Sequence, residues 1–154
     1  MADKSDEPMV VLGVSESWGL LRAAVVGRLA VVVAGQPEIY PVNYLVDHGS
    51  IVFRTAEGTK LAHSIGRPVA FEVDGYDAGS GEAWSVVVKG KAWEVKQLHE
   101  VLEALDLPLF PWHAAPKPHI VRIEPDNVTG RRFHVLDAPA RHMPQQQPRR
   151  ASDE

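Results

Sequence analysis

The chain of 154 residues contains no cysteine. This absence excludes disulfides, thiolate metal sites and a cysteine nucleophile, and it is compatible with the reducing cytoplasm, which we expect as the location. No apolar run approaches the roughly 20 residues that cross a bilayer. The first eight residues are polar and acidic, unlike a secretory signal. We therefore expect a protein that does not associate with membranes.

An excess of positive charge is also missing. Lys and Arg number 16 against 20 Asp and Glu, which gives a net charge of −4, so no overall basic field would attract nucleic acid. The length predicts one domain, and the hydrophobic fraction of 45% is ordinary for a globular protein. We predict one domain over residues 11–137, between a disordered N-terminus (residues 1–10) and a disordered tail rich in Pro, Gln and Arg (residues 138–154).

The common catalytic motifs are absent as well. The sequence has neither GxSxG nor HExxH, and its seven histidines do not pair at helical spacing. His113 and His119 flank a proline-rich stretch, where surface histidines are a simpler interpretation than metal ligands. Because the carboxylates are scattered, no pair is forced together for acid–base hydrolysis. The sequence therefore predicts no metal site and identifies no catalytic residue.

Short strands dominate what is present. The apolar and β-branched patterns predict strands at residues 28–34, 39–46, 51–55, 69–74, 83–95, 119–124 and 131–136. We expect helices at residues 16–26 and 97–107, and one helical turn at residues 61–66. In this pattern Ser15 caps the first helix, Gly27 ends it, Gly90 marks a bulge or bend, and residues 125–130 form a turn. The pattern favours a mainly β domain with two or three helices, built as an antiparallel barrel.

One stretch stands out for its polar side chains. The residues after the predicted hairpin, Arg54 to Lys60, gather a guanidinium, two hydroxyls and an ammonium within seven positions, and Gly58 allows a sharp bend. We call this stretch the hook. Such a set suits a phosphate group, because Arg offers a bidentate fork, Lys a point charge and Thr a neutral donor. The alternative is a pair of ordinary solvated loop charges.

Two further features could complete a ligand site. Trp84 and Ser85 begin the longest strand, where an indole can stack on a flat ring and a hydroxyl can donate a hydrogen bond. The alternative is a core tryptophan beside an ordinary strand serine. Pro41 interrupts a strand, which places it at an edge or a bulge. Backbone groups near such a point could bind the polar rim of a ring.

The segments PVNYLV, IVFRTAEGTKL, VAFEVD and AWSVVVKGKA, in this order, resemble the FMN-binding split barrels of the pyridoxamine-phosphate-oxidase-like superfamily. The similarity runs from about residue 15 to residue 135 and is strongest to the actinobacterial branch that also resembles nitroimidazole-resistance proteins. The resemblance implies an antiparallel split β-barrel that forms a homodimer, with FMN in a cleft between the subunits.

The resemblance also implies roles for individual residues. Arg54, Thr55 and Lys60 would hold the FMN phosphate, with Leu61 nearby. The strand residues Pro41, Val42, Asn43 and Tyr44 would run along the isoalloxazine, mostly through backbone groups, and Trp84 and Ser85 would approach the ribityl chain and ring. The partner chain would close the site through residues around Trp112, Arg131 and Arg132.

One departure bears on the reaction. Pyridoxamine-phosphate oxidases carry basic residues on the strand before the hook, whereas PVNYLV has none, so pyridoxamine phosphate is not favoured as the substrate. The function implied is an FMN-dependent oxidoreductase acting on a small molecule. A deazaflavin-dependent reductase and a non-enzymatic protein that binds flavin or haem are the alternatives.

Overall fold

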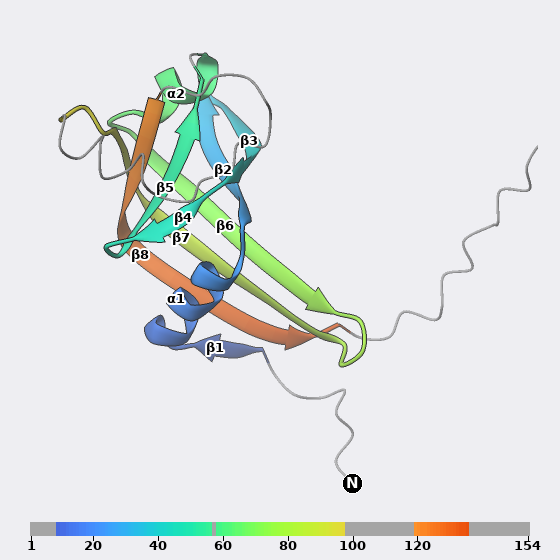
Figure 1. Cartoon of the computed structure of the whole chain (residues 1–154). Coiled ribbons are helices and arrows are strands. Elements are labelled where there is room, and N and C mark those ends of the chain that lie inside the picture. The colour runs from blue at the N-terminus through green and yellow to red at the C-terminus, as the bar shows by residue number, and fades with distance from the viewer. Residues whose placement is uncertain (1–8, 57, 98–118, 136–154) are drawn as a thin grey trace, which may run out of the picture.

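The computed structural model describes residues 9–56, 58–97 and 119–135. They form one antiparallel sheet of eight strands with two helices (Figure 1). The elements are β1 (Val10–Leu12), α1 (Val14–Ala23), β2 (Val26–Val33), β3 (Gln36–Asn43), β4 (Leu45–Asp47), β5 (Ser50–Thr55), α2 (Thr59–Ser64), β6 (Pro68–Asp77), β7 (Glu82–Glu94) and β8 (His119–His134).

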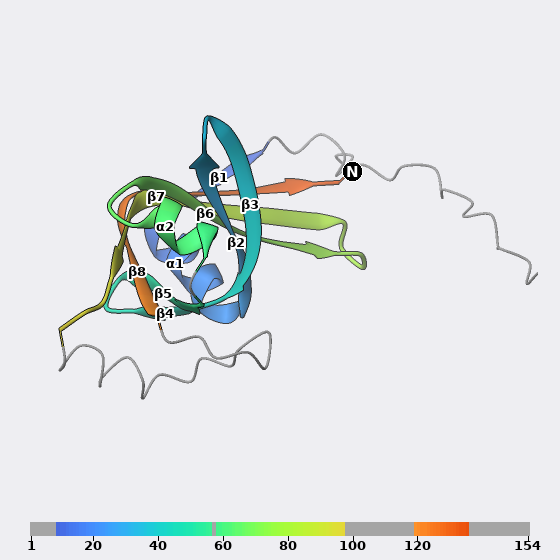
Figure 2. The same ribbon diagram turned by 90° about the horizontal axis from the view of Figure 1, so that it is seen from above.

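The sheet order explains how the barrel closes. Along the sheet the strands run β3-β2-β6-β7-β8-β5-β4, and β1 adds to β8. The two end strands, β3 and β4, are consecutive in the chain and separated only by Tyr44. The chain itself therefore joins the two edges, and seen from above the strands curl into a ring with α2 over its open end (Figure 2). The prediction of a mainly β, antiparallel split barrel is confirmed.

Alternating side chains fill the inside of this ring, as strand geometry requires. Tyr44 and Phe71 meet at its centre, with ring centroids 4.8 Å apart and planes at 69°, an edge-to-face contact that aromatic pairs favour. The other core side chains are mostly β-branched. They include Leu29, Val31, Phe53, Val73, Val86, Val88, Val121 and Ile123.

The predicted bend at Gly90 is a β-bulge between β7 and β8. Lys89 pairs with Asn127 and Gly90 with Pro125, so Asp126 has no partner in the ladder. A side chain at Gly90 would collide with the carbonyl of Glu124. The bulge lets β8 run through Pro125 without a break, since proline is tolerated at bulges. The predicted turn at residues 125–130, and with it the division into two strands, is wrong.

The first helix also differs from its prediction. It begins at Val14 with Gly13 as the N-cap, so Ser15 lies inside it, and it ends at Ala23. Gly27 does not end the helix but belongs to β2, where the ring of Phe71 occupies the space that a side chain would need. Close packing, not a break in the helix, therefore accounts for this glycine.

The predicted strand at residues 39–46 is also wrong as a single strand. It divides at Tyr44, and its halves pair with different strands, β3 with β2 and β4 with β5. The hairpin through Asp47 and Ser50 is confirmed, with positive φ at His48 and Gly49. A predicted loop at residues 75–82 shortens, because β6 continues to Asp77. The extension is possible because Gly75 leaves room for the indole of Trp84.

Some predictions fall outside the described residues. The helix at residues 97–107 and the proline-rich stretch after it lie there almost entirely, as do most of the expected terminal segments, although β1 begins at Val10. Within the described part of the chain, neither helix has the length and apolar character needed to cross a bilayer.

Candidate functional site

The hook lies where β5 ends and α2 begins. Ile51 and Phe53 point into the core, so Arg54 projects from the outer face of the barrel, and Thr55 points inward and is buried. The Thr55 hydroxyl donates to the Ala56 carbonyl over 3.2 Å. Gly58 adopts φ 151°, which L residues rarely adopt, and its carbonyl accepts from the Ala62 N–H at 3.2 Å. The sharp bend expected at Gly58 is present.

The remaining hook residues follow on the helix. Lys60 and Leu61 lie in the first turn of α2, and their side chains are outside the described structure. Their backbone follows directly from Gly58. The hook therefore connects the end of β5 to the start of α2, with residue 57 outside the described structure.

The strand from Pro41 to Tyr44 presents two different faces. Val42 and Tyr44 are buried in the core, whereas Pro41 and Asn43 point to the outer face. The Tyr44 hydroxyl donates to the Leu21 carbonyl at 2.5 Å, and burial raises the pKa of Tyr44 well above its usual range. Only the backbone of Val42 and Tyr44 can therefore contact a ligand, which agrees with the backbone role expected of this strand.

The structure brings this strand and the hook together. β4 pairs with β5 through Leu45 and Val52. β3, which ends at Asn43, also contacts β5. The side chains of Asn43 and Arg54 both point to the outer face. The end of β3 therefore lies beside the strand that leads into the hook.

Trp84 and Ser85 lie elsewhere. Trp84 points to the inner face and packs over Gly75, while Ser85 points outward, in register with Asp74 and Arg131. Along β8, the partner of Arg54 is Ile120 and the partner of Ser85 is Arg131, so the path along the strand between these two partners is about 36 Å at roughly 3.3 Å per residue. In Figure 1, β6, β7 and the C-terminal part of β8 extend together from the barrel as a long arm. The hook lies near α2, and the β6–β7 turn lies at the far end of the arm. One chain does not bring these two groups together.

Arg131 and Arg132, which the family resemblance places where one chain closes the site of its partner, have different environments. Arg132 bonds to Glu16 of α1 at 2.7 Å and to Glu82 at 3.2 Å, which ties the helix to the arm. Arg131 is exposed on the outer face beside Ser85. Trp112 is outside the described residues. Arg131 therefore remains accessible to a ligand or a partner, and Arg132 has a structural contact.

Sequence analysis missed a charged cluster on the same outer face. Arg28 Nη1 lies 3.1 Å from Glu72 Oε2 and 3.3 Å from Asp74 Oδ1. Burial, together with the neighbouring Asp74 carboxylate, raises the pKa of Glu72. Arg28 pairs with Pro41 across the sheet, and Asp74 pairs with Ser85. No local sequence pattern indicates this cluster, because Arg28 and Glu72 lie on different strands and are 44 residues apart in the sequence.

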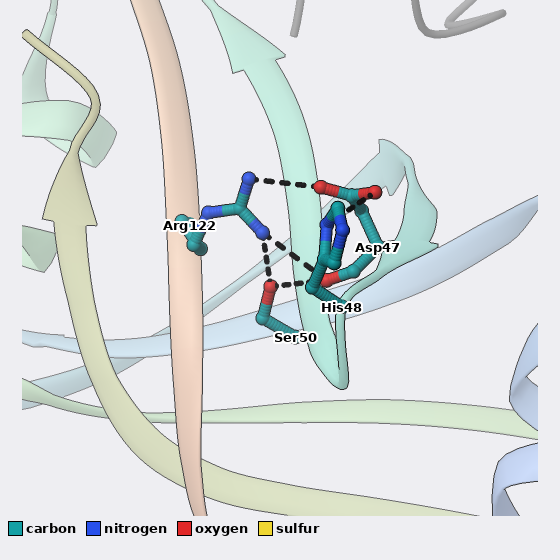
Figure 3. Close-up of polar contacts among 4 residues, drawn as sticks. All are labelled: Asp47, His48, Ser50 and Arg122. Carbon is teal, nitrogen blue, oxygen red and sulfur yellow. Dashed lines mark hydrogen bonds and ion pairs between the residues drawn. The ribbon is translucent and has the colours of Figure 1, made fainter. Parts of the chain in front are cut away.

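A second polar cluster braces the β4–β5 turn (Figure 3). Arg122 of β8 donates to the side chains of Asp47, at 3.0 Å, and Ser50 and to the Asp47 carbonyl at 3.1 Å. Burial opposes the charge on Asp47, but hydrogen bonds from His48 and Arg122 outweigh it and keep the pKa of this carboxyl below its usual value. The cluster fixes the hairpin at the end remote from the hook.

A third contact joins β7 to β8 near the hook. His119 Nδ1 lies 2.6 Å from Glu94 Oε1. His119 is therefore not a simple surface histidine. Among the described residues, no three His, Asp or Glu side chains are arranged to hold a metal ion, and His113 lies outside them.

Two cavities are lined by other parts of the described chain. One of about 370 Å³ lies between α1 and the bulge, and its walls include Trp18, Gly49 and Asn127. The other, of about 290 Å³, lies on the outer face of β2 and β6, and its walls include Val32, Pro37 and Lys89. Neither of these two cavities is lined by a residue predicted to bind cofactor.

Comparisons with known proteins agree with this architecture. Residues 14–132, well over half of the chain, match the family model described as pyridoxamine 5'-phosphate oxidase. An uncharacterized protein of Mycobacterium tuberculosis is 36% identical over 136 residues, which cover 84% of this chain and 89% of that protein.

Solved structures are similar over most of their length. The FAD-binding protein of Mycobacterium smegmatis is 37% identical with a TM-score of 0.71, covering 81% of this chain and 98% of the other. An FAD-binding protein of Mesorhizobium loti is 26% identical with a TM-score of 0.66 and covers 81% and 98%. A protein of Bacteroides thetaiotaomicron named for resistance to 5-nitroimidazole antibiotics shares the fold alone, at 15% identity and a TM-score of 0.68 over 82% and 88%.

The match of the family model agrees with the closed strand order. The chain belongs to the pyridoxamine 5'-phosphate oxidase family and has its split-barrel fold.

Proposed function

We propose that the protein is a flavin-binding oxidoreductase that acts on a small molecule. The observation that carries this proposal is the place of Arg54 on the outer face, shortly before the bend at Gly58 and on the strand that β3 contacts. The guanidinium of Arg54 and the adjoining start of α2 fit an anionic phosphate, whereas the hydroxyl of Thr55 is buried and donates to the Ala56 carbonyl instead. Similar proteins named as FAD-binding support a flavin as the molecule that carries it.

The site requires a homodimer in this proposal. Ser85 lies on the same outer face as Asn43 and Arg54 but far along the arm, so one flavin cannot touch all three within one chain. The outer face of the arm also carries exposed apolar side chains: Val11 is 82% exposed, Tyr76 60% and Phe133 39%. A second copy docked there would cover these side chains and bring its own hook to Ser85 and Arg131.

The flavin would supply the hydride or electron transfer itself. The described residues would do the rest. Arg54 and the hook would hold the phosphate, and the backbone from Pro41 to Asn43 would orient the ring. The arm of the partner would exclude water from one side. This division of roles explains why no catalytic residue is evident in the sequence.

FMN is our first choice of flavin, because the hook is suited to one terminal phosphate. FAD and a deazaflavin cofactor are the competing ligands. The visible absorption spectrum of the purified protein, with release of the chromophore by denaturation and its separation by chromatography, identifies which of them is bound. Tryptophan fluorescence titration of the cofactor-free protein with each then ranks their affinities. A colourless protein that binds none of the three would refute the proposal.

The hook is tested by substitution. Arg54→Ala and Lys60→Ala should each weaken FMN binding by about 1.5–3 kcal/mol, the range for hydrogen bonds to charged groups. Arg22→Ala, an exposed arginine of α1, is the matched control and should bind normally. Wild-type affinity in both hook variants would show that the phosphate is held elsewhere. Tight binding without reduction by a nicotinamide donor would favour the non-enzymatic alternative.

A further inference from the structure

The Glu94–His119 contact lies directly behind the hook. Both side chains are about one-fifth exposed, at 20% and 22%, and their Oε1 and Nδ1 atoms are 2.6 Å apart. His119 is the cross-strand partner of Thr55, the residue that ends β5. Glu94 ends β7, and its second carboxylate oxygen lies 3.8 Å from Lys96. The contact therefore joins the last residue of β7 to the first residue of β8.

The hook has two supports, and this contact connects them. Its strand end, Arg54 and Thr55, is paired with Ile120 and His119 at the start of β8. The helix that follows the hook, α2, is fixed to β7 at its far end instead, because Ile65 pairs with Ala92 and the Gly66 N–H donates to the Ala92 carbonyl at 2.7 Å. In the chain, the bend at Gly58 lies between these two supports.

Backbone pairing between β7 and β8 ends at Glu94 and Val121. Beyond that point, the contacts that join the two strands in the described structure are the Val95 N–H donating to the Ile120 carbonyl at 2.9 Å and the side-chain bond from His119 to Glu94. If that bond is lost, His119 and Thr55 can shift relative to Ala92, and the two ends of the hook move with them. A phosphate site made of short hydrogen bonds is sensitive to such a shift, because misplacement by about 1 Å is costly.

We infer that Glu94 and His119 form a positioning pair, which sets the separation of the two ends of the hook and thereby its affinity for the phosphate of the ligand. The inference rests on the proposed function, since it assigns a role in the same phosphate site. Neither residue need touch the flavin. The pair acts through Thr55 on one side and through Ala92 and α2 on the other.

The test compares FMN with riboflavin, which has the same ring without the phosphate. Glu94→Ala and His119→Ala should weaken FMN binding about 5- to 10-fold, the scale of one net hydrogen bond, and leave riboflavin affinity within about 2-fold. Glu94→Gln keeps an oxygen that can accept from Nδ1–H, so it should restore most of the FMN affinity. A general loosening of the barrel would instead weaken the binding of both FMN and riboflavin, and Glu94→Gln would not restore it.

The Asp47–Arg122 pair is the matched control, because it joins β8 to the opposite end of β5. Arg122→Gln should lower the melting temperature and leave the ratio of FMN to riboflavin affinity unchanged. Equal loss of both ligands in Glu94→Ala, or an unchanged FMN affinity, overturns the positioning role while the proposed function stands. Wild-type protein that binds neither ligand overturns both.

Discussion

Gly90 is held against the backbone of β8, and this contact makes it the most constrained glycine of the sheet. Alanine there would press its methyl group on the Glu124 carbonyl. Because backbone on both sides must move, we expect Gly90→Ala to lower the free energy of unfolding by about 1–3 kcal/mol. Denaturant unfolding measures the change.

Gly19 provides the comparison for that experiment. It is an exposed glycine inside α1 with open space around it, so Gly19→Ala should stabilise the protein by roughly 0.5–1 kcal/mol through helix propensity. If both substitutions changed stability in the same direction, the bulge would not be the constraint described above.

Tyr44 makes the free energy of unfolding depend on pH in the alkaline range. Its folded-state pKa is raised by burial, so the folded protein keeps a proton that the unfolded chain loses above about pH 10. The stabilisation is complete below that pH and falls, by up to about 1.4 kcal/mol per pH unit, as the pH rises further. Tyr44→Phe should remove this part of the pH dependence, and unfolding measured between pH 8 and 11 shows it.

Tyr44→Phe should also lower the stability of the protein at neutral pH. Without the Tyr44 hydroxyl, the buried Leu21 carbonyl loses a donor, which should lower the free energy of unfolding by about 1–2 kcal/mol. Tyr76→Phe, at a largely exposed tyrosine, should change neither the neutral-pH stability nor its alkaline decline. An equal effect of the two substitutions would contradict the role given to the Tyr44 hydroxyl.

At the scale of elements, Asp47 and Arg122 fasten the β4–β5 hairpin to β8. Because the pKa of Asp47 is lowered in the folded state, its contribution is present above about pH 4 and is lost as the pH falls below that. Arg122→Gln should therefore reduce stability at neutral pH and flatten its acid decline between pH 5 and 2. Acid unfolding followed by circular dichroism tests this, with the exposed Arg22→Gln as the control.

Most strands could be predicted from the sequence because their alternation of apolar residues reports local geometry. The hook and its bend were predicted for the same reason, since Arg54, Thr55 and Gly58 are neighbours in the chain. The division of one strand at Tyr44 could not be predicted, because its halves pair with β2 and β5, which are distant from one another in the sheet. The turn predicted at Pro125 was wrong for a similar reason, because the bulge that accommodates this proline depends on Gly90, 35 residues earlier in the sequence.

The site shows the same limit. β3 contacts β5 because it passes into β4, which pairs with β5, and no local pattern reveals this. Glu94 and His119 meet across two strands whose connection is 24 residues long in the sequence. Long-range pairs of this kind follow only from the strand order.

For the whole molecule, the proposed two-subunit site makes a complementation test possible. Arg54→Ala damages the hook, and Ser85→Leu damages the arm without burying new polar groups. Each variant alone should bind FMN weakly. After subunit exchange in an equal mixture, about half of the dimers are mixed and each has one intact site, so about one quarter of the wild-type binding capacity should return.

Light scattering supplies the size of the assembly in that experiment, and isothermal titration supplies the number of sites. A monomeric protein that binds FMN would contradict the dimeric site. So would a dimer in which the mixture shows no recovery, because hook and arm would then act within one chain.

The link at Tyr44 has one more consequence. Because it joins the first and last strands of the sheet order, cutting the chain there, by protease or by circular permutation, would open the barrel along a seam. The strands β3 and β4, which are the two edges of the sheet, would no longer be held together, and their unpaired backbone groups could recruit strands from other molecules. A permutant that begins at Leu45 should therefore aggregate, whereas one cut in the exposed β6–β7 turn should stay dispersed.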